Sequence, residues 1–209
     1  IKALMLDPFM RRLIDPPLKG VAAIWPRRVS ANQITIFGFV LGVGCFLAIA
    51  TNSLTAALIL LGLNRLADGL DGAVARAQSP SELGAYLDIV TDFALWGLLP
   101  IGFIILDSDN SVAAAVLLSS FSMSMTVFLA FAIMAEKRGL ETDAQGRKSF
   151  FYVAGLAEGT ETIAFFAIVI IWPGAFIPAA FVYAGIVYLS VIGRVASSYS
   201  ILKELPSDN

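Results

Sequence analysis

The chain contains no histidine and a single cysteine, and each shortage excludes a class of chemistry. Without histidine there is no Ser-His or Cys-His nucleophile pair and no histidine-ligated zinc. Cys45 stands in an apolar run, where a lone thiol is a small buried hydrophobe that forms neither an internal disulfide nor a zinc cluster. Any proton transfer must therefore use a carboxylate, a lysine, a tyrosine or water.

Charge is also scarce. Only 14% of the 209 residues are charged, whereas a soluble domain has about 25%. The net charge of −2 gives no reason to expect nucleic-acid binding, which needs a basic patch. Because 58% of the residues are hydrophobic and the mean hydropathy is +0.82, the composition predicts a polytopic membrane protein.

Six apolar segments, separated by turn-forming residues, follow one another along the chain. They predict an all-α fold, a six-helix transmembrane bundle that forms one catalytic membrane domain over residues 31–203, with a C-terminal tail at 204–209. Ser30 and Asn32 are candidate N-caps for the first span. The expected spans lie near 34–51, 54–76, 84–106, 111–135, 149–171 and 175–200.

The first 30 residues are too polar to span a membrane, yet apolar and basic residues alternate along them. This pattern predicts an interfacial amphipathic arm, at residues 1–30, on the cytosolic leaflet. Pro16, Pro17 and Pro26 prevent one continuous helix. A poorly ordered terminus is the alternative.

The distribution of lysine and arginine predicts the orientation in the membrane, because these residues concentrate in cytosolic loops. They occur before the first expected span, between the second and third, between the fourth and fifth, and after the sixth, whereas the other three loops have none. We therefore expect a multi-pass protein of the cytoplasmic (inner) membrane, with both termini and the acidic motif described next facing the cytosol.

Four aspartates, Asp68, Asp71, Asp88 and Asp92, lie within or beside apolar sequence, where ionised groups are energetically costly and usually functional. Residues three and four apart share a helix face. Asp68 and Asp71 therefore share a face of the second expected span, and Asp88 and Asp92 share a face of the third. A hairpin of these spans would bring all four together. The first pair shares its face with Gly72, Ala75 and Arg76, while Gly84 begins the next span.

Four converging carboxylates repel one another unless cations neutralise them, and oxygen ligands suit Mg²⁺ or Mn²⁺. Substrate phosphates commonly complete such sites, so the pattern indicates a phosphate or diphosphate substrate. Arg76 could bind a further phosphate. The structural alternative is a set of ion pairs, for example Arg65 with Asp68 and Arg76 with Glu82, but these pairs leave Asp88 and Asp92 unexplained.

These residues resemble the motif of the CDP-alcohol phosphatidyltransferases. That family carries DxxDGxxAR, a linker of about eight residues, and GxxxDxxxD, and this chain matches at every named position from Asp68 to Asp92. The linker between Arg76 and Gly84 has seven residues, which affects its path but not the spacing within either half. The family's six spans and roughly 200-residue length also match.

The resemblance implies transfer of a phosphoryl group from a CDP-linked donor, most simply CDP-diacylglycerol, to a small alcohol acceptor, with release of CMP. It also implies a two-metal site (Mg²⁺ or Mn²⁺) with Asp68, Asp71 and Asp88 as principal ligands and Asp92 as general base, its contact with a metal left open. The donor-binding positions would be Gly72, Ala75, Arg76 and Gly84, although Arg76 could simply anchor the helix in the cytosol. A homodimer embedded among membrane lipids is a further implication.

A second polar cluster is the candidate acceptor site. The family often places basic residues here for phosphorylated acceptors, a role open to Arg147 and Lys148, which could equally be positive-inside anchors. Glu158 and Glu161 would suit an amino-alcohol or polyol, or would pair with Arg65 or Arg194. The acceptor's identity therefore stays open.

Three other functions also accommodate intramembrane acids. An intramembrane prenyltransferase also binds a diphosphate through two Asp motifs and Mg²⁺, but it usually has more spans and lacks the AlaArg…Gly framework. A small transporter would use the acids to relay protons or cations. A catalytically silent family member could act as a partner subunit.

Overall fold

The computed structural model describes residues 16–26, 28–138 and 159–204, and these residues form helices and turns without any strand. The all-α prediction is confirmed. The elements in chain order are α2 (Ala31–Ala50), α3 (Leu54–Gln78), α4 (Glu82–Leu106), the 3-10 turn η1 (Ser108–Asn110), α5 (Ser111–Lys137), α6 (Gly159–Ile171), η2 (Pro173–Ala175) and α7 (Phe176–Glu204).

The helix boundaries follow the expected turn chemistry. Ser30 begins α2 with a capping box, in which its hydroxyl accepts from the Gln33 backbone and the Gln33 side chain accepts from the Ser30 backbone. Asn52, with φ 57°, adopts the left-handed conformation that turns the chain into α3. The part of the expected fifth span before residue 159 lies outside the described residues.

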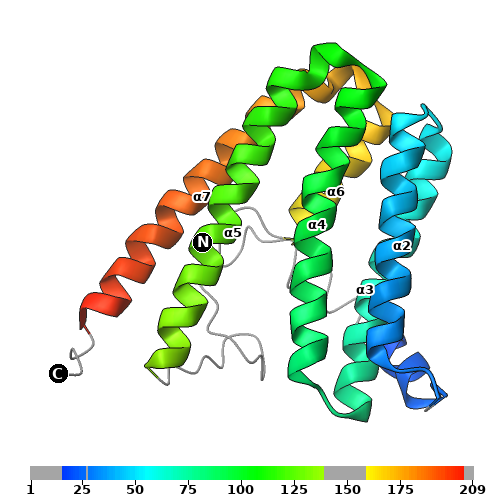
Figure 1. Cartoon of the computed structure of the whole chain (residues 1–209), viewed down its shortest axis with the longest axis vertical. Helices are drawn as coiled ribbons and strands as arrows, with labels where there is room; N and C mark the ends of the chain where they lie inside the picture. Colours follow the sequence, from blue (N-terminus) through cyan, green and yellow to red (C-terminus); the bar gives the residue numbers. More distant parts are fainter. Residues whose placement is uncertain (1–15, 27, 139–158, 205–209) are drawn as a thin grey trace.

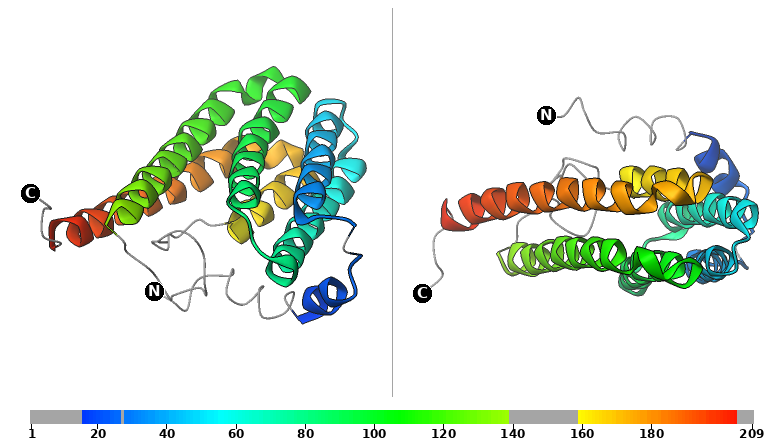
Figure 2. Two further views of the ribbon diagram at one scale, coloured as in Figure 1. Left: turned by 60° about the horizontal axis from the view of Figure 1, so that its bottom comes forward. Right: turned by 90° about the horizontal axis from the view of Figure 1, so that it is seen from above.

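The helices form two groups that meet along the middle of the molecule: α2, α3 and α4 make up one, and α5 and α7 make up the other. Helix α2 packs against both α3 and α4, while α5 and α7 run side by side and α6 lies against α3. Figures 1 and 2 show α5 and α7 extending together away from the first group. Stacked aromatic rings join the groups, including Trp96 on Phe166 and Phe103 on Phe176, with ring centroids 6.0 and 4.3 Å apart.

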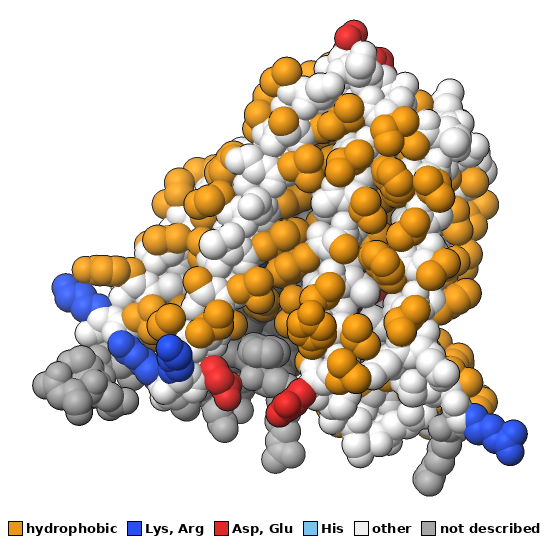
Figure 3. Space-filling view, in the orientation of Figure 1, with side chains coloured by type: hydrophobic (Ala, Val, Ile, Leu, Met, Phe, Trp, Pro, Cys, Tyr) orange, Lys and Arg blue, Asp and Glu red, His pale blue; other side chains and the backbone are white. Residues whose placement is uncertain are grey.

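The surface is that of a membrane protein. Large apolar side chains are exposed on α2 to α7, and Figure 3 shows them covering the flank of the bundle, while the visible lysines and arginines lie only at the end opposite η1. Four helical stretches of the described chain are long and apolar enough to cross a membrane, namely Ala31–Ala50, Glu82–Leu106, Ser108–Lys137 and Pro173–Lys203. Helix α3 is too charged to count among them, and α6 has 13 described residues.

Part of the predicted N-terminal arm is described, and its residues 16–23 are helical. This short helix packs against α3. Ala22 is buried in a small cluster with Ala67 and Val74, and Leu18 lies so close to Gly69 that a Cβ there would be 2.8 Å from its Cδ1. Residues 16–23 are therefore in contact with the helix that carries the first two aspartates.

Close contact between α2 and α4 makes Gly102 intolerant of a side chain. A Cβ there would lie 3.1 Å from the backbone oxygen of Phe46 and 3.3 Å from Ile49, whereas one at Gly97 on the same helix would meet nothing within 4 Å. We expect Gly102→Val to lower the free energy of unfolding by about 1–3 kcal/mol through overpacking. Melting temperatures in detergent, compared with those of Gly97→Val, check this; equal losses in the two variants would contradict it.

Candidate active site

A tight helical hairpin brings the two halves of the acidic motif together. Only residues 79–81 separate α3 from α4. Ser79 has φ 104°, a backbone conformation rare for residues with a side chain, and Ser81 caps α4 by accepting a 3.0 Å hydrogen bond from the Gly84 backbone. The short connection makes the two helices run antiparallel, and both pack on α2 rather than directly on each other.

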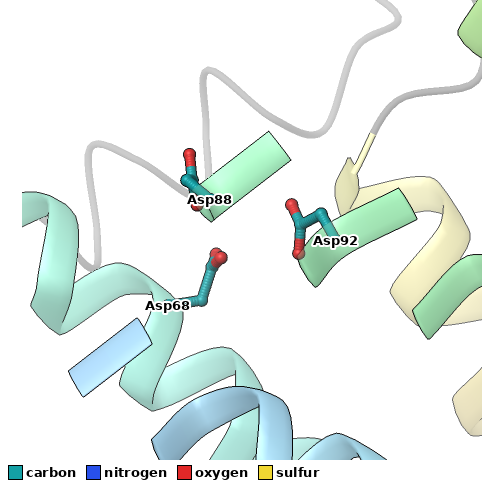
Figure 4. Close-up of side chains that lie close together, drawn as sticks. All are labelled: Asp68, Asp88 and Asp92. Atoms are coloured by element: carbon teal, nitrogen blue, oxygen red, sulfur yellow. The ribbon is translucent and has the colours of Figure 1, made fainter. Parts of the chain in front are cut away.

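Three aspartates converge between these helices. Asp68 from α3 and Asp88 and Asp92 from α4 each offer a carboxylate oxygen, and these oxygens lie within 4.8 Å of one another (Figure 4). In octahedral Mg²⁺ coordination, ligand oxygens are about 3.0 Å apart when adjacent and about 4.2 Å apart when opposite, so the three carboxylates would have to move closer together to bind one ion. The donor set suits a hard divalent cation.

Asp71 is not part of this group of three, but it lines a small pocket together with Asp68 and Asp92. Its side chain is buried, and the pocket wall also includes Thr35 and Gly38 of α2. Ala67, one turn before Asp71, lies against α2, 3.1 Å from a Cβ built on Gly38. Asp71 is thus on the face of α3 that turns toward α2, while Asp68 faces α4.

Arg65 enters the site from α3, and the sequence suggested only a structural role for it. Its Nη2 donates to Asp92 Oδ1 at 3.0 Å, and its Nη1 lies 3.7 Å from Asp68 Oδ2. Its Nε donates to Asn64 Oδ1 at 2.7 Å, and its guanidinium carbon lies 5.2 Å from the centre of the Trp96 ring. The signal was present in the spacing, because Arg65 precedes Asp68 by three residues and Trp96 follows Asp92 by four.

The predicted donor-binding residues lie around the turn that connects α3 to α4. Arg76 is exposed, and its Nη1 would be 3.3 Å from a Cβ at Gly72, so the side chain folds back over that glycine. Ala75 is half-buried on the next turn. A Cβ at Gly84 would lie 3.0 Å from Asn32 Oδ1, so this glycine permits close approach of α2. The ion pairs of the described residues do not include Arg76 with Glu82.

Of the four predicted acceptor residues, only Glu161 is described; Arg147, Lys148 and Glu158 lie outside the described residues. Glu161 is half-buried in the first turn of α6. Of the two arginines considered as its partners, Arg65 binds Asp92, and Arg194 is buried on α7 and donates to Ser124 at 3.3 Å.

An apolar pocket of ≈ 260 Å³ lies between α4 and α5. Ile89, next to Asp88 in sequence, forms one wall. The other wall comes from the C-terminal half of α5 and consists of Phe128, Leu129, Ala132, Ile133, Glu136 and Lys137. The pocket thus has mostly apolar walls, with the charged residues Glu136 and Lys137 on its α5 side.

Comparison with known proteins assigns the family. The family model for CDP-alcohol phosphatidyltransferase matches residues 28–195. The chain therefore belongs to the CDP-alcohol phosphatidyltransferase family, whose members are metal-dependent enzymes. This assignment confirms the predicted class of reaction, transfer from a CDP-linked donor with release of CMP, over the prenyltransferase and transporter alternatives.

Individual relatives agree with that assignment. The chain is 36% identical over 203 residues to inner membrane protein YnjF of Escherichia coli, covering 96% of this chain and 98% of the relative. It is 34% identical over 96 residues to the archaetidylinositol phosphate synthase of Methanothermobacter thermautotrophicus, covering 46% of each chain.

The fold is that of a solved relative. The phosphatidylinositol phosphate synthase of Mycobacterium tuberculosis, crystallised with CDP-DAG bound, superposes with a TM-score of 0.65 at 20% identity, covering 90% of this chain and 94% of that one. A second crystal structure of that synthase contains manganese and citrate. At this level of identity the likeness establishes the shared fold.

Proposed function

We propose that this protein transfers a phosphatidyl group from CDP-diacylglycerol to the hydroxyl of a small alcohol and releases CMP, using the site formed by Asp68, Asp71, Asp88 and Asp92. The observation that carries the proposal is the convergence of three carboxylates within 4.8 Å between α3 and α4, in a membrane protein of this family. Such a cluster suits a metal-bound diphosphate better than any other substrate group.

The surroundings of the cluster favour a lipid-linked donor over a water-soluble CDP-alcohol. The ≈ 260 Å³ pocket between α4 and α5 offers an apolar surface for an acyl chain on the helix that carries Asp88 and Asp92. The cytidine and diphosphate would lie along Gly72, Ala75 and Gly84, where small side chains leave room, and Arg76 would swing from Gly72 to the diphosphate. CDP-DAG bound to the mycobacterial synthase of the same fold supports this choice of donor.

The four aspartates would divide the chemistry. Asp68, Asp71 and Asp88 are the proposed principal ligands of two Mg²⁺ or Mn²⁺ ions, which when bound neutralise the diphosphate and stabilise the charge on the departing CMP. Asp92 is the proposed general base: it accepts the proton of the acceptor hydroxyl as that oxygen forms a bond to the lipid-linked phosphorus and the bond from that phosphorus to CMP breaks. With no histidine in the chain, a carboxylate is the natural base.

The acceptor is proposed only as a small hydroxyl compound. Glu161, near the start of α6, would contact a polyol or amino-alcohol, and Arg147, Lys148 and Glu158 remain predicted contacts. Relatives do not narrow the choice, since the names of two of them, archaetidylinositol phosphate synthase and phosphatidylcholine synthase, indicate different head groups.

We further propose six spans, with α3 and an extended α6 completing the four apolar helices, and a location in the inner membrane with the site and both termini in the cytosol. The gathering of lysine and arginine at the end of the bundle opposite η1 supports this orientation. The name of the Escherichia coli relative supports the location. A homodimer remains a prediction, which the mass of the purified protein in detergent would test.

The test of the proposed function is CMP release by the purified protein with CDP-diacylglycerol and Mg²⁺. The acceptors to supply are glycerol 3-phosphate, inositol, inositol phosphate, serine, ethanolamine and choline. We expect release with one acceptor, complete loss on chelation and recovery on adding Mg²⁺ or Mn²⁺, because four carboxylates cannot hold a diphosphate without cations. A folded protein that releases no CMP with any acceptor would contradict the proposal and favour a silent subunit. CMP release that continues after chelation would show that the reaction does not depend on a metal ion.

A further inference from the structure

We propose that Arg65 is a positioning residue that holds Asp92 in the orientation it needs to act as a base. The guanidinium would fix Oδ1 of the carboxylate, so that Oδ2 is the oxygen presented to the acceptor hydroxyl. The inference rests on the proposed role of Asp92. Arg65 lies outside the DxxDGxxAR…GxxxDxxxD motif, from Asp68 to Asp92, that carries the family resemblance.

The guanidinium is held on three sides. Its Nη2 donates to Asp92 Oδ1 at 3.0 Å, its Nε donates to Asn64 Oδ1 at 2.7 Å, and its flat face lies over Trp96 with the central carbon 5.2 Å from the ring centre. Trp96 is itself fixed by stacking on Phe166 of α6, with the two rings inclined by only 5°. A cation fixed in this way sets the direction of the carboxylate that it binds.

The support for this arrangement reaches a third helix. Asn64, which is buried, uses its amide nitrogen to donate to the backbone oxygen of Gly38 on α2 at 2.8 Å. A continuous set of hydrogen bonds therefore runs from the α2 backbone through Asn64 and Arg65 to Asp92 on α4. Packed helices and hydrogen bonds of this kind are what keep a reactive group in place.

A simple neutralising ion pair would not need this geometry. Exposed ion pairs contribute about 0–1 kcal/mol and tolerate exchange of arginine for lysine. The Arg65 side chain is only 14% exposed and uses two of its donors and its flat face on three separate partners. Lysine has a single charged nitrogen and no planar face, so it cannot reproduce these contacts together. Arg65 is also the sole basic residue among those that line the small pocket containing Asp68, Asp71 and Asp92.

The experiment compares Arg65→Lys and Arg65→Gln with the full-length wild type, using Lys203→Gln as a control at an exposed cation far along α7. We expect kcat for CMP release to fall about 10- to 100-fold in both Arg65 variants, the loss typical of removing the group that orients a functional residue. Mn²⁺-dependent binding of CDP, measured by calorimetry, should change less than about threefold, because Asp68, Asp71 and Asp88 remain. Wild-type kcat in Arg65→Lys would overturn the inference, as would loss of CDP binding in proportion to kcat.

A double variant separates action through Asp92 from any independent role. If Arg65 acts only by positioning that carboxylate, adding Arg65→Lys to Asp92→Asn should lower kcat no further, whereas independent effects would multiply. Multiplication would overturn the inference. If Asp92→Asn alone keeps full activity, the proposed base is wrong; if it is inactive and Arg65→Lys is fully active, only the positioning role fails.

Trp96→Leu provides a second route in case the Arg65 variants do not fold. This change keeps the arginine and all the aspartates but removes the flat surface beneath the guanidinium. We expect a several-fold lower kcat with unchanged Mn²⁺-dependent CDP binding and a melting temperature that still shows a folded protein. An unchanged kcat would contradict the proposal.

Discussion

Asp92→Asn should reduce turnover to a small residual rate while leaving the protein folded and able to bind the CDP donor with Mg²⁺. Asparagine has the same shape as aspartate, and its amide oxygen can still accept the hydrogen bond that Arg65 Nη2 now makes to Oδ1. It cannot accept a proton from the acceptor hydroxyl, and loss of a general base typically lowers the rate about 10²- to 10⁴-fold. The measurement is steady-state CMP release alongside equilibrium binding of CDP.

The matched control for Asp92→Asn is Asp109→Asn, the same chemical change at an exposed aspartate in η1, at the opposite end of the bundle. The control should release CMP at the wild-type rate. Near-normal turnover of Asp92→Asn would remove this residue as the base. Loss of donor binding together with turnover would instead show that Asp92 acts mainly as a metal ligand, a role that its place in the cluster of three also permits.

Asp68→Asn and Asp71→Asn should have the second large effect, a loss of metal-dependent nucleotide binding. Removing one carboxylate from the cluster takes away both a ligand and a negative charge, and we expect the affinity for CDP in the presence of Mn²⁺ to fall roughly 100-fold or more, since even outer-shell partners are worth 10- to 100-fold. Calorimetric titration with and without Mn²⁺ measures this, and Asp109→Asn again serves as control. Unchanged affinity in both variants would refute the metal assignment.

The two substitutions should differ in their effect on stability. Asp71 is buried on the face of α3 that turns toward α2, whereas the Asp68 side chain is 37% exposed and faces α4. Replacing a buried charge with a neutral amide removes a desolvation penalty when no cation is present. Without metal, Asp71→Asn should therefore raise the melting temperature more than Asp68→Asn.

The sequence predicted the helices well because local signals define them. Apolar runs of about 20 residues, the Ser30 cap and the turn residues near Asn52 and Pro80 are features of neighbouring positions, and the ends of α2 to α5 fall within a few residues of expectation. The start of the fifth span, by contrast, lies outside the described residues, so its predicted length remains a prediction.

The details of the site could not be predicted because they depend on how helices rotate against one another. The spacing places Asp68 and Asp71 on one broad stripe of α3, but only packing decides that Asp68 faces α4 and Asp71 turns toward α2. The contact of Arg65 with Asp92 joins residues 27 apart, and the contact with Trp96 spans a still longer separation. The four-residue spacing of Asp92 and Trp96 is compatible with a shared helix face, but it does not show that the tryptophan contacts a guanidinium from another helix.

The charge on α3 has a consequence for how the protein reaches its membrane form during synthesis. Each arginine or aspartate near the centre of a helix opposes insertion by about 2.5–3.5 kcal/mol, less toward the ends. Helix α3 carries Arg65, Asp68, Asp71 and Arg76 and is not among the four apolar stretches. Short turns join α3 to its strongly apolar neighbours α2 and α4. Helix α2 packs directly against both α3 and α4. We therefore expect α3 to enter the bilayer only together with those neighbours, so that a nascent chain ending before α4 would leave the future catalytic helix outside the membrane.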